Sequence, residues 1–415
     1  MKTIVLDDDP TGTQSASNVT VLLDSNADLL EAALRDADSV YVQTNSRAIS
    51  EDEAVALVSR VRDDGREAAR RLGEEVRFVL RGDSTLRGHV FAESNAFAGD
   101  DSIIVFVPAF PAGGRTTIDG VHLVAIDGTT YPAHETEYAE DPVFPFSSGR
   151  LVDYVAEKSD RPALAVPLDA VRSGKLAEAL RDAASGSVVL PDVENDDDVA
   201  LIAEAITAVQ REGRDIVVRS AAPLAAALAG VVSDGLLPTP LVAEPGRTLL
   251  VCGSHTEGAT RQLAPVIEHF GEPAVVDTDA ALANSREAGE DAARAASAQL
   301  DERGLGLLMT ERRRSSEHNT LDHGARVMDA LTTAVRELVP GIDVVIAKGG
   351  ITSADVARIG IGATSARVLG QVLAGVSVWD LTAFDGHRVL YVVVPGNVGG
   401  PDTLTRILEA VQYPM

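Results

Sequence analysis

The feature that most constrains the fold is a series of short apolar runs, rich in β-branched residues, that alternate with amphipathic stretches along the chain. Most of these runs are apolar throughout, which predicts strands buried on both faces of a sheet. A crossover helix is predicted over 51–72, where Ala54, Leu57, Val58 and Val61 recur at helical spacing. The first half contains predicted strands at 3–6, 19–23, 39–43, 76–80, 103–107, 163–166, 188–190 and 216–218, and a second helix at 197–211. This alternation predicts a mainly parallel α/β sheet.

A second series of strands and helices follows a segment rich in proline and glycine, 235–246, which we expect to be a linker. The 415 residues exceed the roughly 250–300 at which a single core stops growing, so two domains are expected, 1–235 and 246–415. The second contains predicted strands at 248–252, 274–277, 306–309, 344–347 and 388–394, and helices at 257–270, 283–300, 323–338 and 354–359. The predicted fold class is α/β, with two α/β domains, mainly parallel sheets and a ligand cleft between them.

The charge balance limits the partners of this chain. A formal net charge of −27 would repel both nucleic acid and an anionic membrane surface, although a local pocket could still attract a small anion. The single cysteine, Cys252, excludes an intrachain disulfide and fits a reducing compartment. No apolar run reaches the ~20 residues that span a bilayer, and the chain begins directly with a predicted strand, so we expect a cytoplasmic protein.

Polar clusters follow three predicted strands of the first domain. The first strand ends in Asp7, Asp8 and Asp9, and three adjacent carboxylates need a cation, a substrate hydroxyl or hydrogen bonds, unless they form only an acidic turn. The segment 81–89 combines two arginines, a carboxylate and two hydroxyls, which is what recognition of a sugar acid would require. In the third cluster, 107–117, Arg115 either reaches into the cleft or pairs with a surface acid.

Glycine-bearing turns follow three predicted strands of the second domain, at 252–258, 347–356 and 394–402. We expect them to converge on a crevice, and a nucleotide is the natural occupant because glycine turns and helix starts bind phosphate. Lys348, one of four lysines in the chain, is expected to face phosphate oxygens. The next helix is expected to be capped by Thr352 or Ser353, with Asp355 completing a capping box. Neither of the familiar phosphate and dinucleotide fingerprints is present.

Several segments have two interpretations that the sequence leaves open. Cys252 is expected to be a small core residue rather than a nucleophile. The basic segment 310–319 is either a solvated loop or a loop near bound phosphates. The apolar helix 224–232 is either core or a dimer face, so a homodimer remains open. No two of His89, His122 and His255 have a metal-ligand spacing, and the sequence leaves the metal ligands open.

These motifs, in this order over nearly the whole chain, resemble the four-carbon acid sugar kinase family, whose members use ATP to phosphorylate threonate, erythronate, 3-oxo-tetronates or related sugar acids. The matching segments are 8–12, 83–88, 108–111, 114–117, 135–137, 141–142, 253–254, 349–353 and 395–399. Family members often have lysine where this chain has Arg81, and many have phenylalanine where it has Pro10. The resemblance implies an N-terminal sugar-acid-binding domain and a C-terminal nucleotide-binding domain. The implied nucleotide-binding residues are Ser254, Lys348, Gly349, Gly350, Ile351, Thr352, Ser353, Gly396, Asn397 and Gly399.

The motifs and the resemblance together predict an ATP-dependent kinase that also uses Mg²⁺. Catalytic roles fall to Asp8, Asp9 and Asp83, of which one would accept the proton of the attacking hydroxyl. The predicted substrate-binding residues are Arg81, Ser84, Thr85, Arg87 and Arg115, with the arginines holding the substrate carboxylate.

Two other functions remain as alternatives. One is a non-catalytic sugar-acid sensor, against which the intact glycine turns and Lys348 argue. The other is a nicotinamide-dependent dehydrogenase, against which the missing dinucleotide fingerprint argues.

Overall fold

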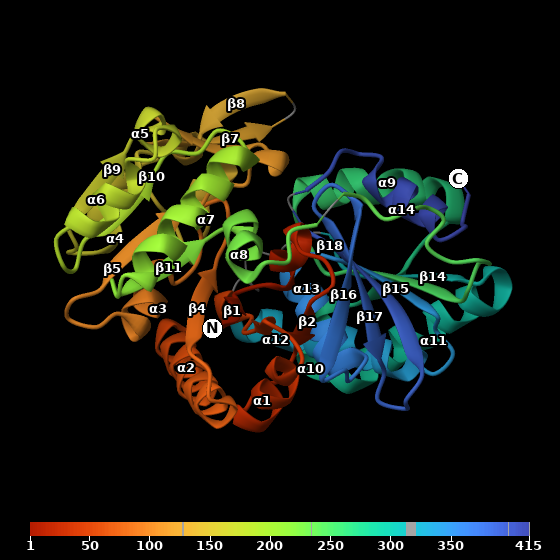
Figure 1. Ribbon diagram of the computed structural model, residues 1–415. Helices are drawn as coiled ribbons and strands as arrows, with labels where there is room; N and C mark the ends of the chain where they lie inside the picture. Colours follow the sequence, from red (N-terminus) through yellow and green to blue (C-terminus); the bar gives the residue numbers. More distant parts are fainter. Residues whose placement is uncertain (127, 234, 313–320, 397, 415) are drawn as a thin grey trace. The chain divides into compact units, whose positions relative to one another are not determined.

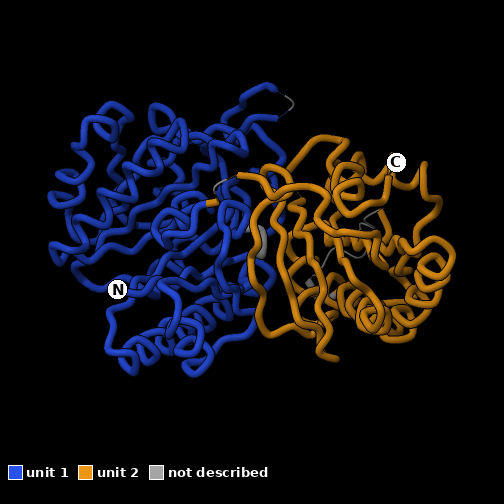
Figure 2. The backbone as a smooth tube through the Cα atoms, turned by 45° about the vertical axis from the view of Figure 1, so that its right-hand side comes forward, with its two compact units in different colours: residues 1–232 blue, residues 233–415 orange. Residues whose placement is uncertain are grey.

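Two α/β units make up the chain in the computed structural model, residues 1–232 and 233–415 (Figure 2). The structure describes residues 1–126, 128–233, 235–312, 321–396 and 398–414. The segment expected as a linker lies in the second unit. There the N–H of Leu237 donates to the carbonyl of Gln371, and that of Leu241 donates to the carbonyl of Ala410. The predicted α/β class is confirmed.

The sheet of the first unit is parallel, in the order β2-β3-β1-β4-β11-β5-β10-β9 (Figure 1). Its central strands are buried along nearly their whole length, as the uninterrupted apolar runs predicted. The strands are β1 (Lys2–Asp7), β2 (Thr20–Leu22), β3 (Ser39–Gln43), β4 (Val76–Arg81), β5 (Ile103–Val107), β9 (Ala163–Val166), β10 (Val188–Pro191) and β11 (Ile216–Ser220).

Helices cover this sheet, and two of them, α2 and α8, pack against both β1 and β4. A capping box between Ser50 and Glu53 begins α2, and Gly73 in the left-handed region ends it. Helix α8 is almost entirely buried and ends at Ala229, so residues 224–229 of the predicted apolar helix at 224–232 belong to the core of this unit, whereas Val232 is exposed. The helices are α1 (Ala27–Arg35), α2 (Glu51–Leu72), α3 (Val90–Phe97), α4 (Leu151–Lys158), α5 (Leu168–Arg172), α6 (Leu176–Asp182), α7 (Asp196–Arg211) and α8 (Ala222–Ala229).

A small antiparallel sheet that the sequence analysis did not predict follows β5. It consists of β6 (Arg115–Ile118), β7 (Val121–Ile126) and β8 (Thr129–Pro132), in that order. Short 3₁₀ turns flank it and precede other elements of the unit: η1 (Pro10–Ser15), η2 (Ser46–Ala48), η3 (Pro111–Gly113), η4 (Ala133–Glu135) and η5 (Glu137–Glu140).

The sheet of the second unit has the order β13-β14-β12-β15-β18-β17-β16, parallel up to β18 and antiparallel from there (Figure 1). Strands β16 and β17 were not predicted. The strands are β12 (Thr248–Cys252), β13 (Ala274–Val276), β14 (Leu305–Thr310), β15 (Val344–Lys348), β16 (Ser365–Leu373), β17 (Val376–Thr382) and β18 (Arg388–Val394).

The helices of the second unit include two, α9 and α14, that form its main core together with strands β12, β14, β15, β16, β17 and β18. The helices are α9 (Glu257–Phe270), α10 (Thr278–Ala283), α11 (Ser285–Arg303), α12 (Leu321–Leu338), α13 (Gly350–Asp355) and α14 (Thr403–Ala410), with a π-helical turn, η6 (Val356–Gly360), after α13. In the described ranges no helix is both long enough and apolar enough to cross a membrane.

Candidate active site

The first polar cluster lies where the strand order of the first unit reverses. From β1 the chain forms β2 and β3 on one side and then returns to β4 on the other side of β1. Asp7, at the end of β1, is in register with Arg81, at the end of β4. Such a switch point, at the carboxyl ends of parallel strands, is where open α/β sheets bind ligands.

Arg81 holds the three consecutive carboxylates at this point. Its Nη1 lies 2.9 Å from Oδ1 of Asp7, 3.4 Å from Oδ1 of Asp8 and 3.6 Å from Oδ1 of Asp9. The Arg81 side chain is 2% exposed. Arg81 therefore organises the acidic turn and is not presented to a ligand as an open guanidinium fork.

The loop after β4 orders the second predicted cluster around Asp83. Arg87 Nε donates to Oδ2 of Asp83 at 2.8 Å, and the Thr85 hydroxyl donates to the same oxygen. Arg87 also approaches Asp141 at 3.6 Å and lies over the ring of Tyr138. Burial opposes ionisation of Asp83, but the neighbouring Arg87 and Arg47 guanidinium groups outweigh it and hold the pKa of this carboxyl well below its usual range. Asp83 is thus a charged anchor for the loop.

Arg47, which the sequence analysis missed, joins the two clusters. It lies in η2, a turn that begins directly after Asn45, whose backbone adopts the left-handed conformation. Its guanidinium pairs with Asp9 and lies 3.6 Å from Asp8 and 3.7 Å from Asp83. Nothing in the sequence around Arg47 marks it, and only the parallel pairing of β3 with β1 brings it to the acidic turn.

Three further buried charged residues were also missed. Arg219, in β11, pairs with Asp8 and with Glu93 of α3, and each of these side chains is at most 2% exposed. Asp7 was seen only as part of an acidic run, yet it is fully buried and one of its oxygens, Oδ2, has no hydrogen-bond partner among the described residues. Burial raises the pKa of Asp7 to about 7, against the lowering effect of Arg81.

Glycines of the motifs make room for these buried charges. A Cβ atom on Gly12 would lie 2.0 Å from Oδ1 of Asp7, and one on Gly82 would lie 2.6 Å from the Arg219 guanidinium. The glycines of these motifs are therefore required by the close approach of backbone to charged side chains.

Ser84 and Arg115 are tied to the small antiparallel sheet. His122, on β7, bonds through Nε2 to the carbonyl of Ser84 at 2.8 Å and through Nδ1 to the hydroxyl of Thr117 at 3.1 Å. Burial lowers the pKa of His122 to about 4, so its neutral ring donates to the carbonyl and accepts from the hydroxyl. Arg115 begins β6, is buried and donates to the carbonyl of Gly113, so it is not a surface ion pair.

In the second unit, the three predicted glycine turns begin at one level of the sheet. Cys252 of β12, Lys348 of β15 and Val394 of β18 are register partners in neighbouring strands. The strand order also reverses between β12 and β15, because β13 and β14 lie on the far side of β12. The turns therefore meet at the switch point of this sheet.

Close contacts join these three turns. The Thr256 hydroxyl, which caps α9, donates to the carbonyl of Gly396 at 3.2 Å. A Cβ atom on Gly349 would lie 3.0 Å from Cβ of Ser254, and one on Gly396 would lie 3.3 Å from Oγ of Ser254. Ser254 is thus the point where the turns converge. Behind Gly399, Gln262 of α9 donates to the carbonyls of Val398 and Gly399.

Lys348 does not face open space. Its side chain is fully buried, and its Nζ donates to the carbonyl of Pro395 at 2.5 Å. Burial lowers the pKa of Lys348 to about 8. Lys348 therefore ties the turn after β15 to the turn after β18 and places its ammonium group beneath them.

The prediction that Thr352 or Ser353 caps the helix after Gly349 is wrong. Helix α13 begins at Gly350, so Thr352 and Ser353 lie within its first turn, and Asp355 is its last residue. The Ser353 hydroxyl donates to the carbonyl of Gly349 instead, and Thr352 is buried. Among the predicted residues here, Ile351 exposes 45% of its surface at the start of the helix.

Arg312 connects the basic segment after β14 to the turn that contains Ser254. Its guanidinium donates to the carbonyl of Ser254 and to the hydroxyl of Thr260, the latter at 2.6 Å. Residues 313–319 of the segment, and the predicted nucleotide-binding residue Asn397, lie outside the described residues. Cys252 is confirmed as a core residue of β12.

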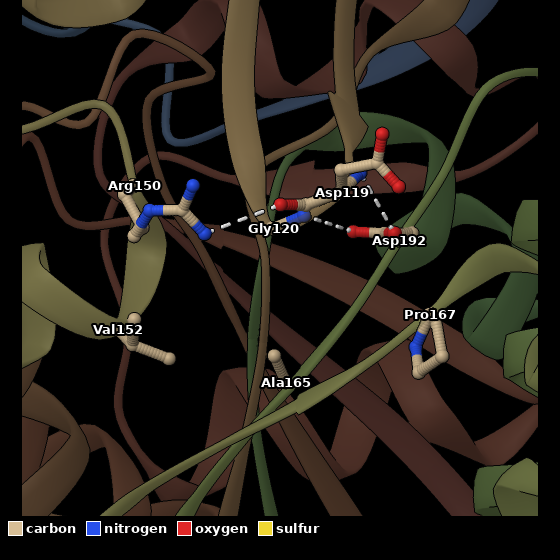
Figure 3. Close-up of a pocket in the computed structure, with 7 residues that line it drawn as sticks. All are labelled: Asp119, Gly120, Arg150, Val152, Ala165, Pro167 and Asp192. Atoms are coloured by element: carbon tan, nitrogen blue, oxygen red, sulfur yellow. Dashed lines mark hydrogen bonds between the residues drawn. The ribbon is translucent and has the colours of Figure 1, made fainter.

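A separate hollow of about 260 Å³ lies in the first unit beside the ends of β9 and β10 (Figure 3). Within it, the N–H groups of Asp119 and Gly120 donate to the Asp192 carboxylate, and Arg150 donates to the carbonyl of Asp119. No predicted site residue lines it, so it carries none of the chemistry described above. Its lining residues are Asp119, Gly120, Arg150, Val152, Ala165, Pro167 and Asp192.

Comparison with known protein families divides the chain in the same way. A family model described as a sugar-binding N-terminal domain matches residues 3–228, and one described as a nucleotide-binding C-terminal domain matches residues 249–404.

Individual proteins also match. The chain is 30% identical to a D-threonate kinase of Bordetella bronchiseptica over 92% of this chain and 89% of that protein. It is 33% identical to a D-erythronate kinase of Heliobacterium modesticaldum over 56% of this chain and 51% of that protein. A crystal structure of a Haemophilus influenzae protein of the DUF1537 family has the same fold, with a TM-score of 0.62 at 18% identity over 99% of both chains.

Proposed function

This chain belongs to the four-carbon acid sugar kinase family, and from that membership we propose that it transfers the γ-phosphoryl group of ATP to a hydroxyl of a four-carbon or closely related sugar acid. Threonate, erythronate and a 3-oxo-tetronate are the candidate substrates. The observation that carries the proposal is that one chain combines a carboxylate and guanidinium cluster at one switch point with three converging glycine turns at another.

The first unit is the proposed sugar-acid site. Asp8 and Asp9 would accept hydrogen bonds from substrate hydroxyls, and Asp8, Asp9 or Asp83 would take the proton of the attacking hydroxyl. The reaction makes little demand on base strength, because phosphoryl transfer proceeds through a loose transition state in which positioning dominates.

The substrate carboxylate would need a guanidinium group, and Arg81, Arg87 and Arg115 are the proposed donors. Arg81 and Arg87 already pair with Asp7, Asp8, Asp9 and Asp83. Binding of a second carboxylate would therefore require one of these internal pairs to open. Arg87 would make the main contact with the substrate carboxylate, because its side chain is 22% exposed and that of Arg81 only 2%.

The second unit is the proposed ATP site, at the turns around Ser254, Gly349 to Ser353, and Gly396 to Gly399. Backbone that approaches a ligand closely suits phosphates, and the ammonium group of Lys348 beneath the turns favours negative charge above them. The exposed side chain of Ile351 offers an apolar surface for the adenine base of ATP. Closure over the bound substrates would exclude water, which would otherwise accept the phosphoryl group.

Mg²⁺ is proposed as the accompanying metal. Within the described ranges no three acidic, histidine or cysteine side chains are grouped to hold a metal ion. An ion that is bound mainly by the phosphates of the nucleotide needs few ligands from the protein. When bound, the ion would neutralise charge on the β- and γ-phosphates.

The test is a coupled assay of ADP release from ATP over threonate, erythronate, 3-oxo-tetronate and isoapionate-type acids. We expect one of them to turn over, with little ADP release in its absence. Asp8→Asn and Asp83→Asn should each abolish turnover and leave ATP binding nearly intact. No ADP release with any acid, despite calorimetric binding of one of them, would favour a non-catalytic sugar-acid sensor.

A further inference from the structure

Arg219 links the acidic turn to a second buried carboxylate, that of Glu93. Its Nη2 lies 3.3 Å from Oδ2 of Asp8, and its Nη1 donates to Oε2 of Glu93. The three residues come from the turn after β1, from α3 and from β11. None is more than 2% exposed, so no ligand is needed to explain why the guanidinium group is held there.

Stability alone is a weak reason for such an arrangement. Well-packed apolar side chains of the same volume often stabilise a core as well as a buried ion pair does, whereas loss of one partner leaves a costly buried charge. The position of Arg219 beside a proposed catalytic carboxylate therefore matters more than its contribution to the core.

The two oxygens of Asp8 have different partners. Oδ1 lies 3.4 Å from Nη1 of Arg81 and 3.6 Å from Nε of Arg47. Oδ2 lies 3.3 Å from Arg219, which is its ion-pair partner in the described part of the chain. Contacts at both oxygens fix the rotation of the carboxylate about its Cβ–Cγ bond.

The loop after β4 is shaped around this guanidinium group. A Cβ atom on Gly82 would lie 2.6 Å from Nη2 of Arg219. One on Gly88, whose φ is +116°, would lie 3.4 Å from the same nitrogen and 3.3 Å from Oδ2 of Asp8. The two glycines that flank the Asp83 motif thus make room for the pair of Asp8 with Arg219.

We propose that Arg219 is a positioning residue that aims the Asp8 carboxylate, and that Glu93 in turn orients Arg219. The assignment rests on the proposed function, in which Asp8 binds or deprotonates a substrate hydroxyl. Arg219 acts through Asp8, because its own contacts are with Asp8 and Glu93.

The variant that tests this is Arg219→Lys, which keeps the charge but cannot form the planar fork that reaches two carboxylates at once. We expect kcat to fall by about tenfold to a hundredfold, as for a misplaced catalytic group, with the KM for ATP unchanged. Glu93→Gln keeps the shape of the side chain and should lower kcat by about threefold to tenfold for the same reason.

A matched control is Arg77→Lys. Arg77 lies in β4 of the same sheet and is also buried, but it donates to the carbonyl of Leu228 and the hydroxyl of Thr207, both at 3.2 Å. Its replacement should cost as much in melting temperature as that of Arg219 and leave kcat within about twofold, since no carboxylate of the site is displaced.

The double variant of Glu93 and Arg219 distinguishes a positioning role from a merely structural one, because it shows whether their effects on kcat are coupled. If Glu93 acts through Arg219, the double variant should have a kcat no lower than that of Arg219→Lys. If the two substitutions lowered kcat independently, so that their factors multiplied in the double variant, Glu93 would not act on Asp8 through Arg219. Wild-type kcat in Arg219→Lys, measured beside an active wild-type enzyme, would overturn the assignment and leave the proposed function standing. An inactive wild-type enzyme would overturn both.

Discussion

Asp7 and Asp8, two adjacent aspartates at the end of β1, have different surroundings that the sequence does not distinguish. Asp7 is fully buried between Arg81 and the backbone of Gly12, and burial raises its pKa to about 7. Asp8 has ion-pair partners at both oxygens. Asp7 is the last residue of β1, whereas Asp8 begins the turn that follows.

Asp7→Asn should change the pH dependence of stability. In the folded wild-type chain Asp7 keeps its proton up to about pH 7, whereas in the unfolded chain it loses it near pH 4. The stabilising contribution of the protonated carboxyl is therefore complete at low pH and is lost as pH rises toward 7. Asparagine has no such loss, so the unfolding free energy of the variant, relative to wild type, should rise by roughly 1–3 kcal/mol between pH 5 and pH 8.

Urea unfolding of both proteins at pH 5, 6, 7 and 8 measures this difference. A difference that stays constant, or that falls as pH rises, would contradict the expected protonation of Asp7.

Sequence reasoning reached the residues of this site unevenly. Asp8, Asp83 and Arg87 stand in short motifs directly after buried strands, so their place at the sheet edge follows from the strand alone. Arg219 contacts Asp8 across 211 positions of sequence, and such a contact depends on the order of the strands. For Lys348, the motif suggested a ligand contact, and the structure shows in addition a backbone partner for its Nζ, the carbonyl of Pro395.

At the scale of elements, strands were predictable where they are apolar throughout. Strands β3, β5, β9, β12 and β18 have the predicted bounds. Strands β5 and β12 are buried at every position and β3 and β18 at most positions, whereas β9 is an apolar run that is partly exposed. Strand β16 alternates between exposed and buried residues, and β8 is largely exposed, so neither forms a continuous apolar run. All of the missed strands lie in antiparallel pairs: β6, β7, β8, β16 and β17. Strand β17 was missed although it is buried along most of its length.

Gly349→Ala tests the convergence of the turns in the second unit. Gly349 has a φ of +111°, and an added Cβ would lie 3.0 Å from Cβ of Ser254. We expect ADP to bind about tenfold or more weakly by calorimetry, because the turn must move away from Ser254.

Gly341→Ala is the control for that variant. Its φ of +105° imposes a similar backbone strain, but nothing lies within 4 Å of the added Cβ. Its ADP affinity should equal that of wild type. If both variants bound ADP equally weakly, strain and not the contact with Ser254 would be the cause.

At the scale of the whole molecule, two α/β units were predictable from length and from the alternation of strands and helices. The boundary between the two units was harder to predict. Residues 235–246 have the composition of a linker, but Leu237 and Leu241 bond to the second unit, and composition does not reveal such backbone contacts.

The assignment of one ligand to each unit predicts a reciprocal pattern in the full-length protein. Asp83→Asn should lower turnover by about a hundredfold or more and leave ADP affinity within about twofold. Gly349→Ala should weaken ADP and leave the affinity for the sugar acid unchanged. The coupled assay of ADP release measures turnover, and calorimetry with each ligand separately measures the affinities. Loss of both affinities in either variant would contradict the division.

The pairing of Asp8 with Arg219 also has a consequence for how the protein is made. During synthesis the acidic turn leaves the ribosome well before its partner Arg219 on β11, which follows 211 positions later in a unit that ends at residue 232. Until then Asp8 and Glu93 lack their shared counter-charge, and burying them would be costly. The part of the proposed catalytic site around Asp8 is therefore completed only when the first unit is almost fully synthesised.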